Sequence, residues 1–453
     1  MSSEPRSASV VLLVDSKTRD LPVATLIAHH LRMQGITAWL EPLEAYQGVL
    51  AAHRPELILF NHLTANHLAR YSQRLAELGV LTAVLPNEGI MYDPDDLRFN
   101  AGKFHPSAHI DCFFCWNTPH ADALREAGFD RRTRIEVVGV PRFDFYFEPW
   151  SRLFRRPAAR ARSRPQILFC TNFVTAKFWE LPREQGDKFF AAWQDRIPLY
   201  RNYWAAIEAH FKGRARSLDF LRAILADGRY DVVLRPHPRE EIGFYEEFLA
   251  RLPAPQRERV TLQAASSITE LILDCDLELS IETCTTAMES WIAGKPTLEI
   301  VLERHPLWHI REQAVCGLAC DRPEKLVPLI EQSLAAPPQP ELAARRRGHL
   351  AKWCAAPDGT SSERLARVIA EAVRQKRPTD WSRLTATDHR RATKLRALRR
   401  LGHAYHYDPF MPLKRALFAS RYAIKDHAYR KSIKPGDVTA AQAELNACLN
   451  RNN

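Results

Sequence analysis

Short apolar runs alternate with amphipathic stretches along most of the chain. In the first third of the chain, the apolar runs lie at residues 9–15, 37–40, 57–60, 81–85, 112–116 and 135–138. The stretches between them that carry apolar side chains at the helical period are residues 22–34, 65–77 and 119–127. Buried strands that alternate with helices are typical of a doubly wound parallel sheet, so we expect an α/β domain here.

The alternation starts again in the middle of the chain. Apolar runs lie at residues 166–171, 232–234 and 277–280, and a long helical pattern follows the first of them. A chain of 453 residues is also too long for one core. We therefore predict an N-terminal domain at residues 1–150, a basic linker at 151–164, a second Rossmann-like domain at 165–345 and a basic helical C-terminal segment at 346–453.

Groups that suit phosphate binding follow the strand at residues 232–234. They are Arg235 and His237 of an Arg-Pro-His-Pro sequence, in which the two prolines restrict the loop. Ligands of open α/β sheets bind beyond the carboxyl ends of strands. This segment is therefore a candidate nucleotide site, although an ordinary turn after a strand fits it equally well.

A threonine-rich turn follows the strand at residues 277–280. Thr283, Thr285 and Thr286 precede a helix that we expect at residues 287–293. Their hydroxyls are expected to cap this helix, and the free N–H groups at a helix start attract phosphate. Glu289 lies one turn into the helix, where it can accept hydrogen bonds from ribose hydroxyls. Together the two segments favour a nucleotide site more than either does alone.

Three strand ends of the first domain also carry polar groups. Lys17 and Arg19 follow the first strand and are expected to point into a crevice between the domains. Glu88 follows residues 81–85 and suits acid or base chemistry, because burial raises the pKa of a carboxyl group. A loop carboxylate in water is the alternative. Arg142 and Asp144 follow residues 135–138, and they also suit an ion pair that fixes this loop.

These motifs resemble a known family. Arg-Pro-His-Pro followed by the threonine-rich turn, a Glu and Gly-Lys-Pro is similar to the C-terminal half of GT-B glycosyltransferases. The similarity is closest to enzymes with cytidine-activated donors: bacterial sialyltransferases with an HP motif, Kdo transferases of capsule and lipopolysaccharide, and polyglycerol-phosphate polymerases. Ser-Lys-x-Arg-Asp-Leu, Pro-Asn-Glu-Gly and Gly-x-Pro-Arg-Phe-Asp resemble motifs of bacterial surface carbohydrate biosynthesis proteins. The resemblance covers roughly residues 8–335 and is looser at the start.

The resemblance implies a GT-B fold, in which two Rossmann-like domains face a central cleft, and a transferase of bacterial surface polysaccharide. The donor would be a CMP-activated sugar, with Kdo or a related ulosonic acid first, and the acceptor a glycan or a lipid-linked molecule. The residues that would bind the donor nucleotide are Thr171, Asn172, Arg235, His237, Thr283, Thr285, Thr286 and Glu289.

The resemblance also implies roles in the first domain. The sialyltransferases use an acidic-acidic-Gly motif, and here Asn87 takes the first place, which leaves Glu88 as the acid or base. A retaining mechanism like that of the β-Kdo transferases would make Asp144 or Glu88 the nucleophile. Lys17, Arg19 and Arg142 would recognise an acceptor phosphate or the sugar carboxylate.

No metal or other cofactor is expected. Asp274-Cys-Asp276 has the Asp-x-Asp sequence of a metal-binding pair, but it precedes an apolar strand instead of following one. His237, Arg235 and the start of the threonine-rich helix would stabilise the leaving phosphate in place of a metal ion.

Two alternatives remain open. A CDP-polyol phosphotransferase, acting on CDP-glycerol or CDP-ribitol, shares both motifs of the second domain. Its second His-containing base motif is not clear in the first domain, although His105 and His109 are present. A non-catalytic scaffold that has kept the GT-B fold is the other alternative.

Positive charge gathers in the C-terminal segment. Residues 371–440 contain 17 Lys or Arg and 6 Asp or Glu, which gives +11, the formal net charge of the whole chain. Basic and apolar residues interleave there as in a membrane-surface helix, while a solvated helix or a nucleic-acid patch is the competing interpretation. We expect contact with an anionic inner membrane and no nucleic acid, because no nucleic-acid motif accompanies the charge.

The rest of the sequence is consistent with a cytoplasmic protein on the inner face of that membrane. It contains no run of 18 apolar residues and no apolar signal core near its start. The nine cysteines show no framework spacing, and Cys112 and Cys115 are expected to form a reduced, buried pair.

Overall fold

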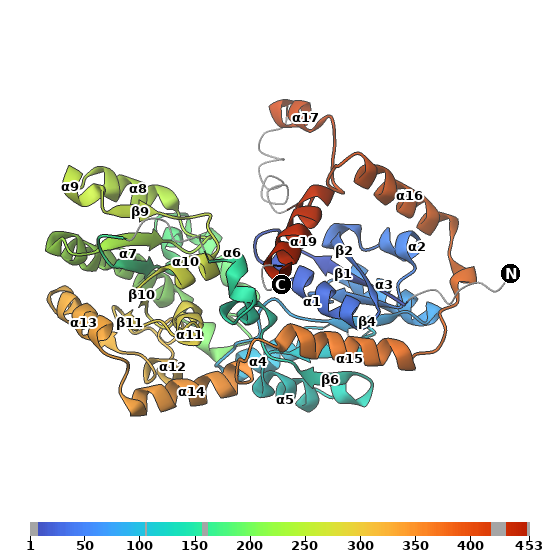
Figure 1. Cartoon of the computed structure of the whole chain (residues 1–453), viewed down its shortest axis with the longest axis horizontal. Helices are drawn as coiled ribbons and strands as arrows, with labels where there is room; N and C mark the ends of the chain where they lie inside the picture. The colour runs from blue at the N-terminus through green and yellow to red at the C-terminus, as the bar shows by residue number, and fades with distance from the viewer. Residues whose placement is uncertain (1–7, 105–106, 156–161, 418–431, 451–453) are drawn as a thin grey trace. The chain divides into compact units, whose positions relative to one another are not determined.

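The computed structural model describes residues 8–104, 107–155, 162–417 and 432–450. His105, part of the expected linker and residues 418–431 of the basic tail lie outside the described residues. Contacts divide the chain into two compact units: unit 1 has residues 1–90, 100–144 and 358–453, and unit 2 has residues 91–99 and 145–357. Figure 1 labels many of the elements of both units.

Unit 1 contains a parallel sheet of six strands in the order β2-β1-β3-β4-β5-β6. Its strands are β1 (Ser9–Val14), β2 (Thr37–Pro42), β3 (Leu57–Phe60), β4 (Leu81–Val84), β5 (Cys112–Cys115) and β6 (Arg134–Val137). All residues of β1, β3 and β5 are buried, as expected for parallel strands that are covered on both faces. The strand order reverses between β1 and β3, where doubly wound sheets bind ligands.

The helices of unit 1 come from both ends of the chain. They are α1 (Asp20–Met33), α2 (Val49–His53), α3 (Asn66–Leu78), α5 (Thr118–Glu126), α15 (Ser361–Gln375), α16 (Ala386–Arg400), α17 (Met411–Leu417) and α19 (Pro435–Asn450). Helix α15 lies alongside α1 (Figure 1), and Leu365 and Ile369 join Val10 and Leu12 of β1 in one core. Helix α19 adds Val438 to the same core. The predicted helical C-terminal part therefore exists, and it completes the first sheet domain.

Unit 2 contains a second parallel sheet of six strands, in the order β12-β11-β10-β7-β8-β9. Its strands are β7 (Gln166–Cys170), β8 (Asp231–Arg235), β9 (Val260–Leu262), β10 (Leu277–Ile281), β11 (Thr297–Ile300) and β12 (Ala319–Cys320). This is the Rossmann strand order, with its reversal between β7 and β10. The fold class predicted from the sequence, two Rossmann-like domains with a helical C-terminal part, is confirmed.

Nine α-helices lie wholly within unit 2 among the described residues, and the sequence predicts two of them, α6 and α7, as one long helical stretch. They are α6 (Arg183–Phe190), α7 (Tyr203–Asp227), α8 (Ile242–Ala250), α9 (Ala254–Arg257), α10 (Ile268–Asp274), α11 (Thr285–Ile292), α12 (Arg311–Ala314), α13 (Pro323–Ala335) and α14 (Pro340–Cys354). The helical pattern after β7 forms α6 and α7, with a 3-10 turn at Pro198–Tyr200 between them. Helix α4 (Pro94–Gly102) is divided between the units: residues 94–99 belong to unit 2 and residues 100–102 to unit 1.

Two further sequence expectations concern the whole chain. Cys112 and Cys115 at the ends of β5 are buried and carry free thiols, as predicted. None of the helices among the described residues is both long and apolar enough to span a bilayer.

Candidate functional site

In unit 2, His237 follows β8 and is held in one orientation. Its backbone N–H donates to Oε1 of Glu240 (2.8 Å), and its ring Nδ1 accepts from the backbone N–H of Arg239 (3.2 Å). Burial, followed by the charges of Arg239 and Arg235, lowers the pKa of His237 to about 4, so the ring is neutral near pH 7. A neutral ring that accepts at Nδ1 carries its proton on Nε2. His237 is therefore an uncharged hydrogen-bond donor.

Glu240 is the centre of the network that supports this loop. Its carboxylate accepts hydrogen bonds from Oγ1 of Thr171 (2.8 Å), from the N–H of His237 and from the hydroxyl of Tyr245. Thr171 follows β7, and Tyr245 is fully buried on α8. The network therefore joins the carboxyl ends of β7 and β8. Sequence reasoning named Thr171 and His237 but missed Glu240 and Tyr245; the spacing of Glu240 three residues after His237 was the available signal.

Arg235, the last residue of β8, directs its guanidinium group at backbone carbonyls. Its Nη1 donates to the carbonyls of Pro236 (2.7 Å) and Ala264 (2.8 Å), and its Nη2 donates to that of Ser266 (3.2 Å). Burial lowers the pKa of Arg235. Arg235 thus ties the loop that carries His237 to the segment after β9, and its role as a phosphate ligand stays a prediction.

Helix α11 begins at Thr285, earlier than the sequence predicts, because Cys284 occupies the cap position in an extended conformation. The cap residue makes no side-chain hydrogen bond to the helix, so the expectation of a threonine cap is wrong. An uncapped helix start offers its first N–H groups to an anion. Thr285 itself is half-buried at this position.

The other two threonines are engaged inside unit 2. Thr283 donates its hydroxyl to the carbonyl of Trp308 (2.8 Å) and accepts from the N–H of Ile310 (2.7 Å). Thr286 donates to Oε1 of Glu278 (2.8 Å), which is fully buried on β10. These hydroxyls therefore shape the turn.

Glu289 and Asn172 are the remaining donor-side candidates. Glu289 is 4% exposed on α11, and its Oε2 accepts a hydrogen bond from the hydroxyl of Tyr146 (2.6 Å). Asn172 is half-buried directly after Thr171. Their contact with a ribose or a phosphate stays a prediction.

In unit 1, a hollow with a cavity volume of about 70 Å³ lies where the strand order reverses. Its polar lining includes Arg19, Asp20, Asn61, Asn87 and Arg142, of which Arg19 pairs with Asp20 (2.7 Å), and Trp116 is part of its aromatic wall. The guanidinium carbon of Arg142 lies 4.9 Å from the centre of the Trp116 ring. Guanidinium groups, amides and an aromatic ring suit an anionic sugar or a phosphate.

Glu88 lies next to this hollow and faces solvent. Its side chain is 75% exposed, and its Oε1 lies 3.6 Å from Nη1 of Arg19. Gly89 holds the loop in place, since its carbonyl accepts from Nδ2 of Asn117 (2.7 Å). A Cβ atom on Gly89 would lie 2.7 Å from the Trp116 ring, so only glycine fits this approach. The structure thus brings Glu88, Arg19 and Arg142 to one edge of the sheet.

Lys17 is placed differently. Its Nζ forms an ion pair with Asp437 on α19 (2.6 Å), and it is absent from the described lining of the hollow. This contact ties the loop after β1 to the C-terminal helix of the same unit. The predicted role of Lys17 in acceptor recognition has no contact that supports it.

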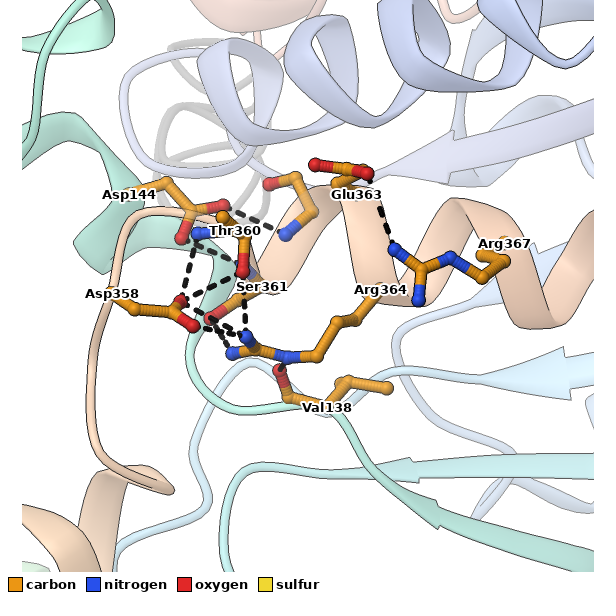
Figure 2. Close-up of polar contacts among 9 residues, drawn as sticks. Val138, Asp144, Asp358, Thr360, Ser361, Glu363, Arg364 and Arg367 are labelled. Atoms are coloured by element: carbon orange, nitrogen blue, oxygen red, sulfur yellow. Dashed lines mark hydrogen bonds and ion pairs between the residues drawn. The ribbon is translucent and has the colours of Figure 1, made fainter.

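Asp144 stabilises the start of α15. Its two carboxylate oxygens accept hydrogen bonds from the backbone N–H groups of Ser361 (3.0 Å) and Ser362 (2.7 Å), as Figure 2 shows for the labelled Ser361. Asp144 is 1% exposed. A buried carboxylate with both oxygens engaged does not reach a sugar in this conformation, which argues against the predicted role as nucleophile.

No family model matches the chain, and no curated protein matches it. Solved structures do resemble its fold. A UDP-N-acetylglucosamine 2-epimerase is similar at 13% identity over 83% of this chain and 99% of its own, with a TM-score of 0.49. The UDP-GlcNAc 2-epimerase of Neisseria meningitidis, solved with UDP-GlcNAc, shares 10% identity over 80% of this chain and 100% of its own (TM-score 0.47). A glycosyltransferase of Rickettsia africae shares 11% identity over 82% of this chain and 100% of its own (TM-score 0.45).

These similarities concern the arrangement of strands and helices alone. The strand orders of the two sheets and the helical C-terminal part place the chain in the GT-B fold class. The donor, the acceptor and the reaction are matters for proposal.

Proposed function

We propose that this protein is a glycosyltransferase that uses a nucleotide-activated sugar as donor. One observation carries the proposal: His237 is held neutral, with its proton on Nε2, at the strand ends where a Rossmann-like domain binds its ligand. Such a donor stabilises negative charge as it develops on a leaving phosphate. The uncapped start of α11 offers further N–H groups in the same domain.

The finer proposal concerns the substrates. The Arg-Pro-His-Pro and threonine-rich segments suit a CMP-activated donor, with Kdo or a related ulosonic acid first, and an acceptor in lipopolysaccharide or capsule assembly. In unit 1, Arg19 and Arg142 suit the carboxylate of an ulosonic acid or an acceptor phosphate. Glu88, exposed beside Arg19, is the candidate acid or base. No metal ion takes part in this proposed transfer.

The experiment compares CMP-Kdo with CDP-glycerol and measures release of CMP. The proposal expects release from CMP-Kdo. Release should be at least about 100-fold slower in Glu88→Gln, since a general acid or base contributes about that much. It should be about 100-fold slower in His237→Ala too, since one donor to the developing charge contributes a similar factor. Release from CDP-glycerol alone would instead identify a polyol phosphotransferase. Release from neither donor, together with unchanged surface glycan in cells that carry either variant, would support a scaffold.

We also propose that the protein works at the inner face of the cytoplasmic membrane. Residues 401–417 of unit 1 carry large apolar side chains that are well exposed: Leu401, Tyr407, Phe410, Leu413 and Leu417. Arg400 and Lys394 are exposed basic residues nearby in sequence. Exposed apolar groups beside basic ones suit an anionic lipid surface.

A further inference from the structure

Three side chains of unit 2 lie together outside the proposed transfer machinery. Glu282 follows β10, Glu299 lies in β11, and His309 lies in the loop after β11. One ligand atom of each lies within 4.8 Å of the other two. Nδ1 of His309 lies 3.0 Å from Oε2 of Glu282 and 3.4 Å from Oε1 of Glu299.

The charges of this cluster do not balance. The side chains of Glu282 and Glu299 are 8% and 6% exposed, and that of His309 is 16% exposed. Two carboxylates leave a net negative charge even when the imidazole is protonated. Burial of unbalanced charge is costly, whereas a divalent cation with a neutral imidazole brings the sum to zero.

One oxygen of each carboxylate lies close to Nδ1 of His309. Oε1 of Glu282 accepts from the backbone N–H groups of Leu302 (2.8 Å), Glu303 (2.8 Å) and Arg304 (3.3 Å), which leaves Oε2 toward His309. Oε1 of Glu299 is buried and accepts no hydrogen bond of good geometry among the described residues; Nδ1 of His309, at 3.4 Å, is its ion-pair partner. A proton on Nδ1 of His309 can make a good hydrogen bond to one of these two oxygens, whereas a metal ion can be bound by both.

We propose that Oε2 of Glu282, Oε1 of Glu299 and Nδ1 of His309 bind one divalent transition-metal ion, with zinc the best match. Imidazole and carboxylate ligands together suit zinc better than magnesium or calcium. In a tetrahedral zinc site with ligands at about 2.0–2.2 Å, neighbouring ligand atoms lie about 3.3 Å apart. The two distances from Nδ1, 3.0 Å and 3.4 Å, bracket that value.

The ion would have a structural role. It would join the end of β10 to the loop after β11. In this loop, the carbonyl of Trp308 accepts from the hydroxyl of Thr283, and the N–H of Ile310 donates to it. The ion therefore stabilises the threonine-rich turn and takes no part in departure of the phosphate. The inference stands independently of the proposed sugar transfer.

Metal content and thermal unfolding of the full chain test the site. We expect about one equivalent of zinc per chain after purification with zinc and desalting. Zinc added back after treatment with EDTA should raise Tm, because an ion that binds only the folded state stabilises it. Glu299→Gln and His309→Ala should lose the bound zinc and the zinc-dependent rise in Tm. Glu303→Gln and His305→Ala, in the same loop, are the matched controls and should keep both.

Stability without metal separates a lost site from a folding defect. Glu299→Gln preserves the shape of the side chain and removes one buried charge, so the EDTA-treated variant should unfold no earlier than the EDTA-treated wild type. A wild type that retains no zinc and shows no zinc-dependent Tm overturns the proposal. Equal zinc content in Glu299→Gln, His309→Ala and the two controls overturns it as well.

Discussion

At the scale of single residues, the approach of Gly89 to Trp116 controls the position of Glu88. A Cβ atom at Gly89 would lie 2.7 Å and 2.8 Å from two ring carbons of Trp116, so Gly89→Ala must displace the loop or the ring. We expect a loss of about 1–3 kcal/mol in the free energy of unfolding, the usual range for overpacking. The rate of CMP release should fall by more than the loss of folded protein explains, because the loop carries Glu88. Urea unfolding and CMP release measure the two effects.

A matched control for this substitution lies in unit 2. Gly243 lies inside α8, and a Cβ atom there would meet no heavy atom of the described residues within 4 Å. Gly243→Ala should therefore leave activity unchanged and raise the free energy of unfolding by less than about 1 kcal/mol, because Gly243 is in the first turn of α8, where helix propensity counts for less than in a helix interior. An equal response of both variants would contradict the role assigned to Gly89.

The lowered pKa of His237 predicts how the free energy of unfolding changes with pH. The ring has a pKa of about 4 in the folded protein and about 6.5 when unfolded, so the unfolded state binds more protons between these values. The contribution of His237 is fully present above pH 6.5 and is lost as the pH falls to 4, by up to ~3 kcal/mol. His237→Gln should flatten this acid-side decline in the free energy of unfolding. Urea titrations at a series of pH values test it, and an unchanged slope would contradict the lowered pKa.

At the scale of elements, α15 depends on a carboxylate that lies far away in the sequence. Asp144 accepts from the first two N–H groups of this helix, and Arg364 of α15 donates to the carbonyl of Val138 (3.1 Å) near the end of β6 (Figure 2). Asp144→Ala should cost about 1–3 kcal/mol, because it removes a cap and leaves buried N–H groups unpaired. Urea unfolding measures the cost.

Glu363 offers a control on the same helix. It lies in the first turn of α15 with its side chain 46% exposed, and it pairs with Arg367 (3.2 Å), as Figure 2 shows. Glu363→Gln should change stability by less than about 0.5 kcal/mol, as exposed ion pairs do. If Asp144→Ala instead abolishes CMP release while stability stays intact, Asp144 is the nucleophile that the sequence suggested and its structural role is secondary.

The sequence predicts elements well where their signal is local. Strands such as β1 and β3 are short runs of buried apolar residues, and such runs show in any window of a few residues. The apolar run of β8 likewise predicts that His237 lies just beyond a strand end. The partners of Asp144 are 217 and 218 residues away, and Thr171 meets Glu240 across 69 residues. No local pattern encodes such contacts, so the sequence does not predict that Asp144 accepts from the first N–H groups of α15 or that Thr171 meets Glu240.

At the scale of the whole molecule, the fold uses part of the basic tail internally. Arg396 of α16 donates to the carbonyls of Ala51 and Ala52 in α2, and Arg399 pairs with Glu41 (2.7 Å). These arginines anchor α16 to unit 1 and are less free to meet lipid than their number in the sequence suggests. The membrane proposal therefore depends on residues 401–417 rather than on α16.

Vesicle binding tests this proposal with point substitutions. Removal of the tail is unsuitable, because Val438 of α19 belongs to the core of unit 1. The combined change Phe410→Ser, Leu413→Ser and Leu417→Ser removes three side chains that are 59–64% exposed. Each side chain contributes roughly 1 kcal/mol or more when lipid buries it, so binding to phosphatidylglycerol vesicles should weaken at least about tenfold.

Met33→Ser is the matched control, since Met33 is an apolar residue of α1 that is 73% exposed. It should bind these vesicles as the wild type does. The wild type should also prefer phosphatidylglycerol to phosphatidylcholine and lose that preference at high salt, because salt screens the attraction between basic side chains and anionic headgroups. Binding that is unaffected by the triple change, or equal on both lipids, would assign the exposed apolar side chains of residues 401–417 to another partner.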